Sequence, residues 1–219
     1  MKTNGLFKEI MFIIIHVIPV IYLVMIYDKL PAEIPMHFNL EGVPDSYSSK
    51  DKLYWLVGLM NGIGYILFLV IPFIDPKKFA EEHAKIYFRL RIGLTITFAS
   101  LSALGVYLAY GDVQIGLKMM GLLLVMICLF LGNYMQAVRT NYFIGIRTPW
   151  TLSSETVWKK THLLTGRLFF YGGLASLPVI FFVDFNLAPF APALVLISAS
   201  LFGLIYSFVL YKKEKSNGK

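Results

Sequence analysis

Six long runs of apolar residues, separated by short polar segments, dominate the pattern of this chain of 219 residues. They cover residues 10–27, 53–74, 92–111, 119–138, 168–183 and 185–211. Because a helix of roughly 20 apolar residues crosses the hydrocarbon core of a bilayer, each run predicts one membrane-spanning helix. The fifth run is short, so we expect its helix to begin well before residue 168. Pro189 and Pro192 predict that the last span starts near residue 192. The pattern therefore predicts an all-α integral membrane protein, a bundle of six transmembrane helices.

The composition supports this fold class, since 57% of the residues are hydrophobic. With six spans, 16 of the 20 Lys and Arg residues fall on the side that holds both termini and the segments 75–91 and 139–167. The positive-inside rule predicts that this side is cytoplasmic. Acidic residues divide six to seven, which leaves the inner side at +10 and the outer side at −3. The basic excess is thus a signal of topology, and no direct nucleic-acid binding is expected.

The segment between the fourth and fifth spans, residues 141–166, is apolar but cannot be a spanning helix, because Gly145 and Pro149 interrupt it. Irregular backbone at membrane depth is tolerated only against protein or a wet cavity. We therefore expect a structured cytoplasmic loop that packs into the underside of the bundle. A helix should follow, with Ser153 as its N-cap and Glu155 in its first turn. On that helix Trp158 and His162 share one face.

Two interpretations of this segment are open. Asn141, Arg147, Thr148, Trp158 and His162 form a polar constellation that could bind a phosphate or carboxylate, through the guanidinium fork and a cation–π contact. Alternatively, Arg147 satisfies backbone carbonyls of the broken loop, and this structural role is favoured. We further expect Arg147, Trp150 and Trp158 to form a packed plug that holds spans four and five together.

The segment 28–52 is the largest one predicted outside the membrane, and three prolines stiffen it. Gly42 and Asp45 are typical of turn positions. His37, Asn39, Glu41 and Asp45 could coordinate a cation, but their spacing matches no standard motif, so no metal is expected. A rigid extracellular lid is the better interpretation.

Few chemical groups lie within the predicted spans. His16 in the first span is either a functional group or, as favoured here, a neutral imidazole bonded to a neighbouring helix. Asn61 in the second span could bond across helices. Cys128 is the only cysteine, which excludes an intrachain disulfide and a cysteine-based metal site. Nucleotide-binding and hydrolase motifs are absent from the sequence, so neither a cofactor nor an enzymatic activity is expected.

Two stretches carry a resemblance to a known family. The sequence NYFIGIRTPWTLSSETVWKKTH at 141–162, with Gly166 following, closely resembles the signature of the SdpI family of bacterial multi-span membrane proteins. LPAEIPMHFNLEGVPDSYSSK at 30–50 resembles the small domain of unknown function that precedes this signature in the family. The resemblance implies two units. Residues 1–74 would form a two-span unit with the extracellular loop, and residues 75–219 a four-span unit that carries the signature.

The founding function of this family is immunity to a secreted killer peptide. The resemblance therefore implies a multi-pass protein of the bacterial plasma membrane, and the distribution of Lys and Arg predicts that both termini are cytoplasmic. Its partners would be a secreted peptide toxin, membrane lipids and a soluble transcriptional repressor recruited to the inner face. A small six-span transporter and a membrane enzyme acting on lipid headgroups remain as alternatives.

Both stretches supply candidate site residues. The ligand-binding, partner-binding or structural residues expected in the cytoplasmic signature are Asn141, Gly145, Arg147, Thr148, Pro149, Trp150, Trp158, His162 and Gly166. The candidate extracellular contacts are His37, Asn39, Gly42, Asp45 and Lys50.

Overall fold

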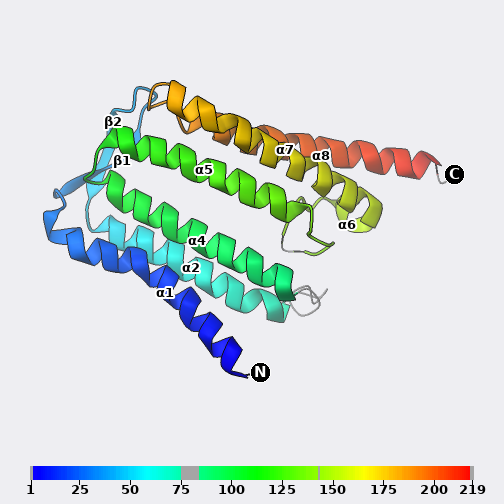
Figure 1. Ribbon diagram of the computed structural model, residues 1–219, viewed down its shortest axis with the longest axis horizontal. Helices are drawn as coiled ribbons and strands as arrows, with labels where there is room; N and C mark the ends of the chain where they lie inside the picture. Colours follow the sequence, from blue (N-terminus) through cyan, green and yellow to red (C-terminus); the bar gives the residue numbers. More distant parts are fainter. Residues whose placement is uncertain (1, 75–83, 143, 218–219) are drawn as a thin grey trace.

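The computed structural model describes residues 2–74, 84–142 and 144–217, and within them six long helices run side by side (Figure 1). Each is long and apolar enough to cross a membrane, as the sequence predicted. Their bounds are Lys2–Ile26 (α1), Lys52–Ile74 (α2), Ala84–Leu108 (α4), Val113–Met135 (α5), Glu155–Phe182 (α7) and Phe190–Asn217 (α8). The short elements are the 3₁₀ turn η1 (Tyr27–Lys29), the helix α6 (Pro149–Ser153) and the strands β1 (Glu33–Phe38) and β2 (Pro44–Ser49).

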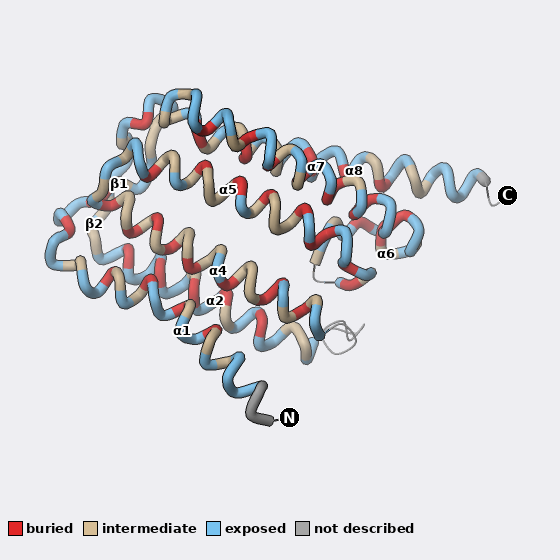
Figure 2. The backbone as a smooth tube through the Cα atoms, in the orientation of Figure 1, coloured by how far each residue is buried: buried red, intermediate tan, exposed pale blue. Residues whose placement is uncertain are grey.

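The outward faces of the helices remain exposed and apolar, which is the surface expected in contact with lipid (Figure 2). Leu67 on α2 is 50% exposed, and Met126 on α5 and Val209 on α8 are exposed to a similar degree. The protein is thus a helical bundle of the multi-pass membrane class.

Helix α4 packs against α1 and α2 on one side and against α5 on the other, while α5, α7 and α8 pack closely together. One buried cluster joins the two groups, because Phe68 of α2 and Leu90 of α4 meet Tyr134 and Trp158 from α5 and α7. The cluster lies at the same end of the bundle as α6, which we call the signature end. The predicted division at residues 74 and 75 remains a prediction.

The other end of the bundle, which we call the hairpin end, carries an antiparallel β-hairpin (Figure 1). The sequence predicted a rigid lid here but no strands. Ile34 of β1 is fully buried against Leu53, Val57 and Val106 from α2 and α4. This inward side chain anchors strand β1 to the helices.

Helix α7 begins at Glu155 and runs without a break to Phe182, so the fifth span does start well before residue 168. Its N-cap is Ser154, whose hydroxyl accepts a hydrogen bond from Val157 N–H at 3.2 Å. The expectation of Ser153 is therefore wrong, because that residue is the last one of α6. The final helix starts at Phe190, close to the predicted position.

Candidate functional site

At the signature end, Asn141 organises the loop that follows α5. Its side chain is fully buried, donates to the carbonyls of Arg139 and Ile144, and accepts from Ile144 N–H at 2.7 Å. A buried irregular loop needs such partners, because its backbone groups have no water to bond with. The Asn141 side chain therefore supplies hydrogen bonds that regular secondary structure would otherwise supply to the backbone of this loop.

His162 of α7 binds the next part of the same loop. Its Nε2 accepts the backbone N–H of Ile146 at 3.0 Å, so Nδ1 carries the proton and donates to the carbonyl of Trp158 at 2.9 Å. The imidazole is 1% exposed and stacks on Trp158 with ring centroids 4.0 Å apart. Both nitrogens are thus occupied by backbone groups, which leaves none for a ligand.

Gly145 is the residue that lets the loop approach this histidine. Its φ is +107°, in the region that favours glycine, and a Cβ there would collide with the imidazole of His162. A side chain at position 145 would therefore break the bond between His162 and Ile146.

Thr148 and Pro149 start helix α6. The Thr148 hydroxyl accepts Thr151 N–H at 3.2 Å, and the Thr151 hydroxyl accepts Thr148 N–H at 2.9 Å, so the two form a capping box. Pro149 occupies the first turn, where its missing N–H is not needed. The indole N–H of Trp150 then donates to the Ser207 hydroxyl of α8.

The expected plug exists only in part. Trp158 is fully buried, and its indole N–H donates to the Val138 carbonyl at the end of α5 at 2.9 Å, which joins α5 to α7. Trp150 joins the loop to α8 rather than to the fourth span. Arg147 is exposed and donates to the Tyr142 carbonyl at 2.8 Å, which agrees with the favoured structural role. It lies outside the packed group because a guanidinium keeps its charge in water where it can.

Gly166 marks the closest approach of α5 and α7. A Cβ at this position would lie 2.8 Å from the Gly132 carbonyl oxygen, and one at Gly132 would lie 2.6 Å from the backbone nitrogen of Phe170. Small residues permit such contact between membrane helices. The signature residues therefore build one packed structure.

At the hairpin end, His37 and Asp45 form an exposed pair across the strands. Their Nδ1 and Oδ1 atoms are 2.6 Å apart, and the side chains are 69% and 44% exposed. Asn39 closes the turn by accepting the N–H groups of Glu41 and Val43. Gly42 has φ +75° and lies against the ring of Phe185. Among the described residues no group of three or more possible metal ligands occurs.

Lys50 holds the base of the hairpin. Its Nζ donates to the Tyr27 carbonyl at 3.1 Å and lies over the Tyr27 ring. Beside it, hydroxyl groups of Tyr27 and Ser49 donate to the Asp51 carboxylate and hold the pKa of that group below its usual value. Of the five predicted extracellular contacts, His37 and Asp45 therefore have exposed side chains, while Asn39, Gly42 and Lys50 hold the hairpin in its conformation.

A polar network inside the bundle was only partly foreseen. His16 Nδ1 donates to the Asn61 side chain at 3.2 Å, and Asn61 donates to the Ser102 hydroxyl at 2.9 Å, so the predicted bond to a neighbouring helix is confirmed. Arg91 of α4, 7% exposed, makes a bidentate ion pair with Glu9 of α1. This pair was not predicted, because the two residues are 82 positions apart in the chain.

The comparisons with known proteins agree with this architecture. Residues 137–208 match the SdpI/YfhL protein family, and residues 14–61 match a domain of unknown function, DUF1648. A curated relative is 28% identical over 207 residues, which cover 94% of this chain and 97% of the relative. It is "Immunity protein SdpI" of Bacillus subtilis (strain 168). No solved structure is significantly similar to the chain. This multi-pass membrane protein is thus similar to the SdpI/YfhL family over residues 137–208 and to one immunity protein over most of its length.

Proposed function

We propose that this protein gives the cell that makes it immunity to a secreted killer peptide, by a non-enzymatic mechanism in the plasma membrane. The observation that carries the proposal is the similarity to an immunity protein along nearly the whole of both chains. The described signature residues support a non-enzymatic role, because Asn141, Thr148 and His162 bond mainly within the protein.

We further propose that the hairpin end faces outward and meets the peptide. The uneven distribution of Lys and Arg supports this orientation. The exposed pair of His37 and Asp45 is the polar surface that such a peptide meets first. In this scheme the unit of residues 1–74 supplies the contact, and the unit of residues 75–219 supplies the rigid frame.

A repressor docking site at the signature end is the finer part of the proposal. Lys159 and Lys160 are exposed on the first turns of α7, and Lys159 pairs with Glu155 at 3.0 Å. They provide a basic surface beside the packed loop. Recruitment on peptide binding requires that the peptide bind two conformations of the bundle unequally.

The test uses a Bacillus subtilis strain that lacks its own SdpI and expresses this protein instead. The cells are challenged with the peptide fraction of spent medium from strain 168. Survival above that of the empty strain is expected. Death at the same peptide concentration, with the protein present in the membrane, would contradict the immunity function.

A double variant tests the outer contact. His37→Ala with Asp45→Ala should lower survival while the protein level in the membrane stays normal. Ser46→Ala is the matched control, because this exposed residue pairs with His37 across the strands and loses only a hydroxyl. Full survival of the double variant would remove this pair from the mechanism.

A further inference from the structure

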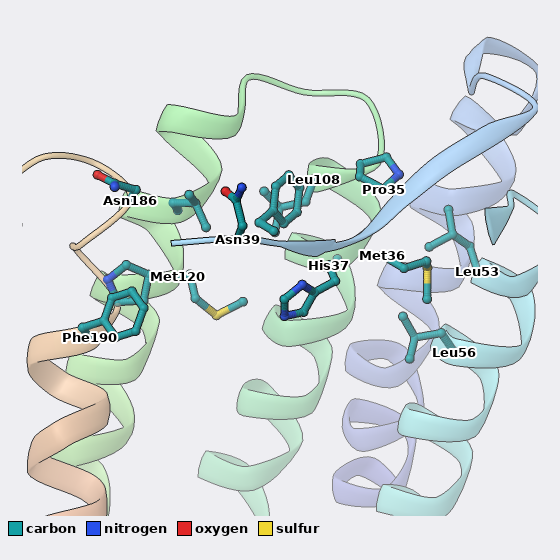
Figure 3. Close-up of a pocket in the computed structure, with 14 residues that line it drawn as sticks. Pro35, Met36, His37, Asn39, Leu53, Leu56, Leu108, Met120, Asn186 and Phe190 are labelled. Atoms are coloured by element: carbon teal, nitrogen blue, oxygen red, sulfur yellow. The ribbon is translucent and has the colours of Figure 1, made fainter. Parts of the chain in front are cut away.

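A cavity of about 360 Å³ lies beneath strand β1, among the outer ends of α2, α4, α5 and α8 (Figure 3). Leu56, Leu108, Leu117, Met120 and Phe190 give it walls that are mainly apolar. These five residues come from α2, α4, α5 and α8. The cavity therefore joins the two helical groups at the hairpin end.

The hairpin crosses this cavity as a strap that is fastened at both ends. At its tip, Asn186 in the connection between α7 and α8 donates to the Leu40 carbonyl at 2.6 Å. At its base, Lys50 is bonded to the carbonyl of Tyr27. His37 and Asn39 form part of the lining (Figure 3). The site is thus an apolar space whose roof adds two polar side chains.

The charges around the roof are mostly acidic. Asp45 bonds to the lining residue His37, Glu41 follows the lining residue Asn39 by two positions, and Asp184 precedes Asn186 by two. Lys52 and Lys118, next to the lining residues Leu53 and Leu117, are the basic exceptions. With seven acidic and four basic residues, the predicted outer side carries −3 in total. None of the described residues that line the cavity carries a carboxylate, but an apolar space whose roof is surrounded by acidic residues, here called the acidic roof, is complementary to a cationic amphipathic peptide.

Resting on the proposed function, we infer that this cavity binds apolar side chains of the killer peptide while the acidic roof faces the peptide's cationic groups. A lipid acyl chain would match the walls but would bring an anionic or zwitterionic headgroup to the carboxylates. A peptide that is both apolar and cationic matches both parts of the site.

Filling the cavity tests this inference. Gly105 of α4 lines the cavity, and a Cβ there meets only Leu56 Cδ2, at an ordinary 3.9 Å. Gly105→Leu should therefore fold and occupy part of the space. The peptide concentration that kills half of the cells should fall about tenfold or more, since one buried apolar side chain of the peptide loses its place. Gly62→Leu is the matched control, because no atom lies within 4 Å of a Cβ there.

The outcomes separate the two proposals. Death of cells with the unaltered protein would overturn both. Survival with the unaltered protein and equally with Gly105→Leu would overturn only the binding of the peptide in this cavity.

Photo-cross-linking provides a second measurement that does not depend on the folding of Gly105→Leu. Met120→p-benzoylphenylalanine places a reactive group in the cavity, and Met126→p-benzoylphenylalanine, on the lipid-exposed side of the same helix, is its control. Illumination of cells treated with the peptide fraction should give an adduct of peptide mass at position 120 and none at 126. A phospholipid adduct alone at position 120 would assign the cavity to lipid and overturn the inference.

Discussion

The contact between α5 and α7 gives the sharpest test of the packing. Gly166→Ala adds one methyl group where a Cβ would lie 2.8 Å from the Gly132 carbonyl oxygen, and 3.4 Å is an ordinary contact. The atom that the new methyl group meets belongs to the backbone and cannot rotate away, so the two helices must move apart to remove the clash. Such overpacking costs about 1–3 kcal/mol, against a gain of at most about 1 kcal/mol because Ala favours a helix over Gly. With the overpacking cost at the middle of this range, we expect a net loss of about 1 kcal/mol in the free energy of unfolding.

The chain contains its own reporter for this measurement. Cys128 is the only cysteine and is fully buried, so a fluorogenic maleimide reacts with it when the bundle opens on heating. For a protein of this size 1 kcal/mol shifts the midpoint by about 2–4 °C. Gly166→Ala should lower the midpoint in detergent, and Gly62→Ala, where a Cβ meets open space, should leave it unchanged or raise it. An unchanged midpoint for Gly166→Ala would refute the close contact.

Three further predictions follow from the described contacts. Glu9→Gln should destabilise the protein by about 1–3 kcal/mol, because the buried guanidinium of Arg91 loses its charged partner, while the 37% exposure of Glu9 weakens the pair; the double variant with Arg91→Met should recover part of this loss in the same thermal assay. Trp158→Phe loses the indole bond to the end of α5 and replaces the indole by a smaller ring at a fully buried site, so the midpoint should fall by the equivalent of about 1–3 kcal/mol. Reporter fusions after Lys50 and after Lys160 should lie on opposite sides of the membrane, and the same side for both would contradict the topology.

The spans were predictable because their signal is local. A run of about 20 apolar residues has one structural solution in a bilayer, and all six were found. The hairpin was missed for an equally local reason, because Pro35 and Pro44 argue against strands. A two-stranded hairpin tolerates them, since both of its strands are edges. Only one residue of β1, Ile34, is fully buried, so alternation of apolar and polar positions gave little guidance.

The candidate site was predictable in position but not in pairing. The sequence indicated that residues 141–166 form a packed loop, and it favoured backbone bonding for Arg147. It could not assign Trp150 to α8, because Ser207 lies 57 positions further along the chain. Nor could the sequence show which of the two adjacent serines is the N-cap of α7. The same side chain suits either position, and only the end of α6 at Ser153 decides between them.

Removal of killing activity from the medium tests the central claim most directly. Cells of the SdpI-deficient strain that express this protein are incubated with a known amount of the peptide fraction, and the killing activity left in the supernatant is measured. If the outer end of the bundle holds the peptide, activity should fall in proportion to the protein in the membrane, and much less with the double variant of His37 and Asp45. Protected cells that leave the activity of the medium unchanged would contradict capture at the outer face and would favour a transport mechanism.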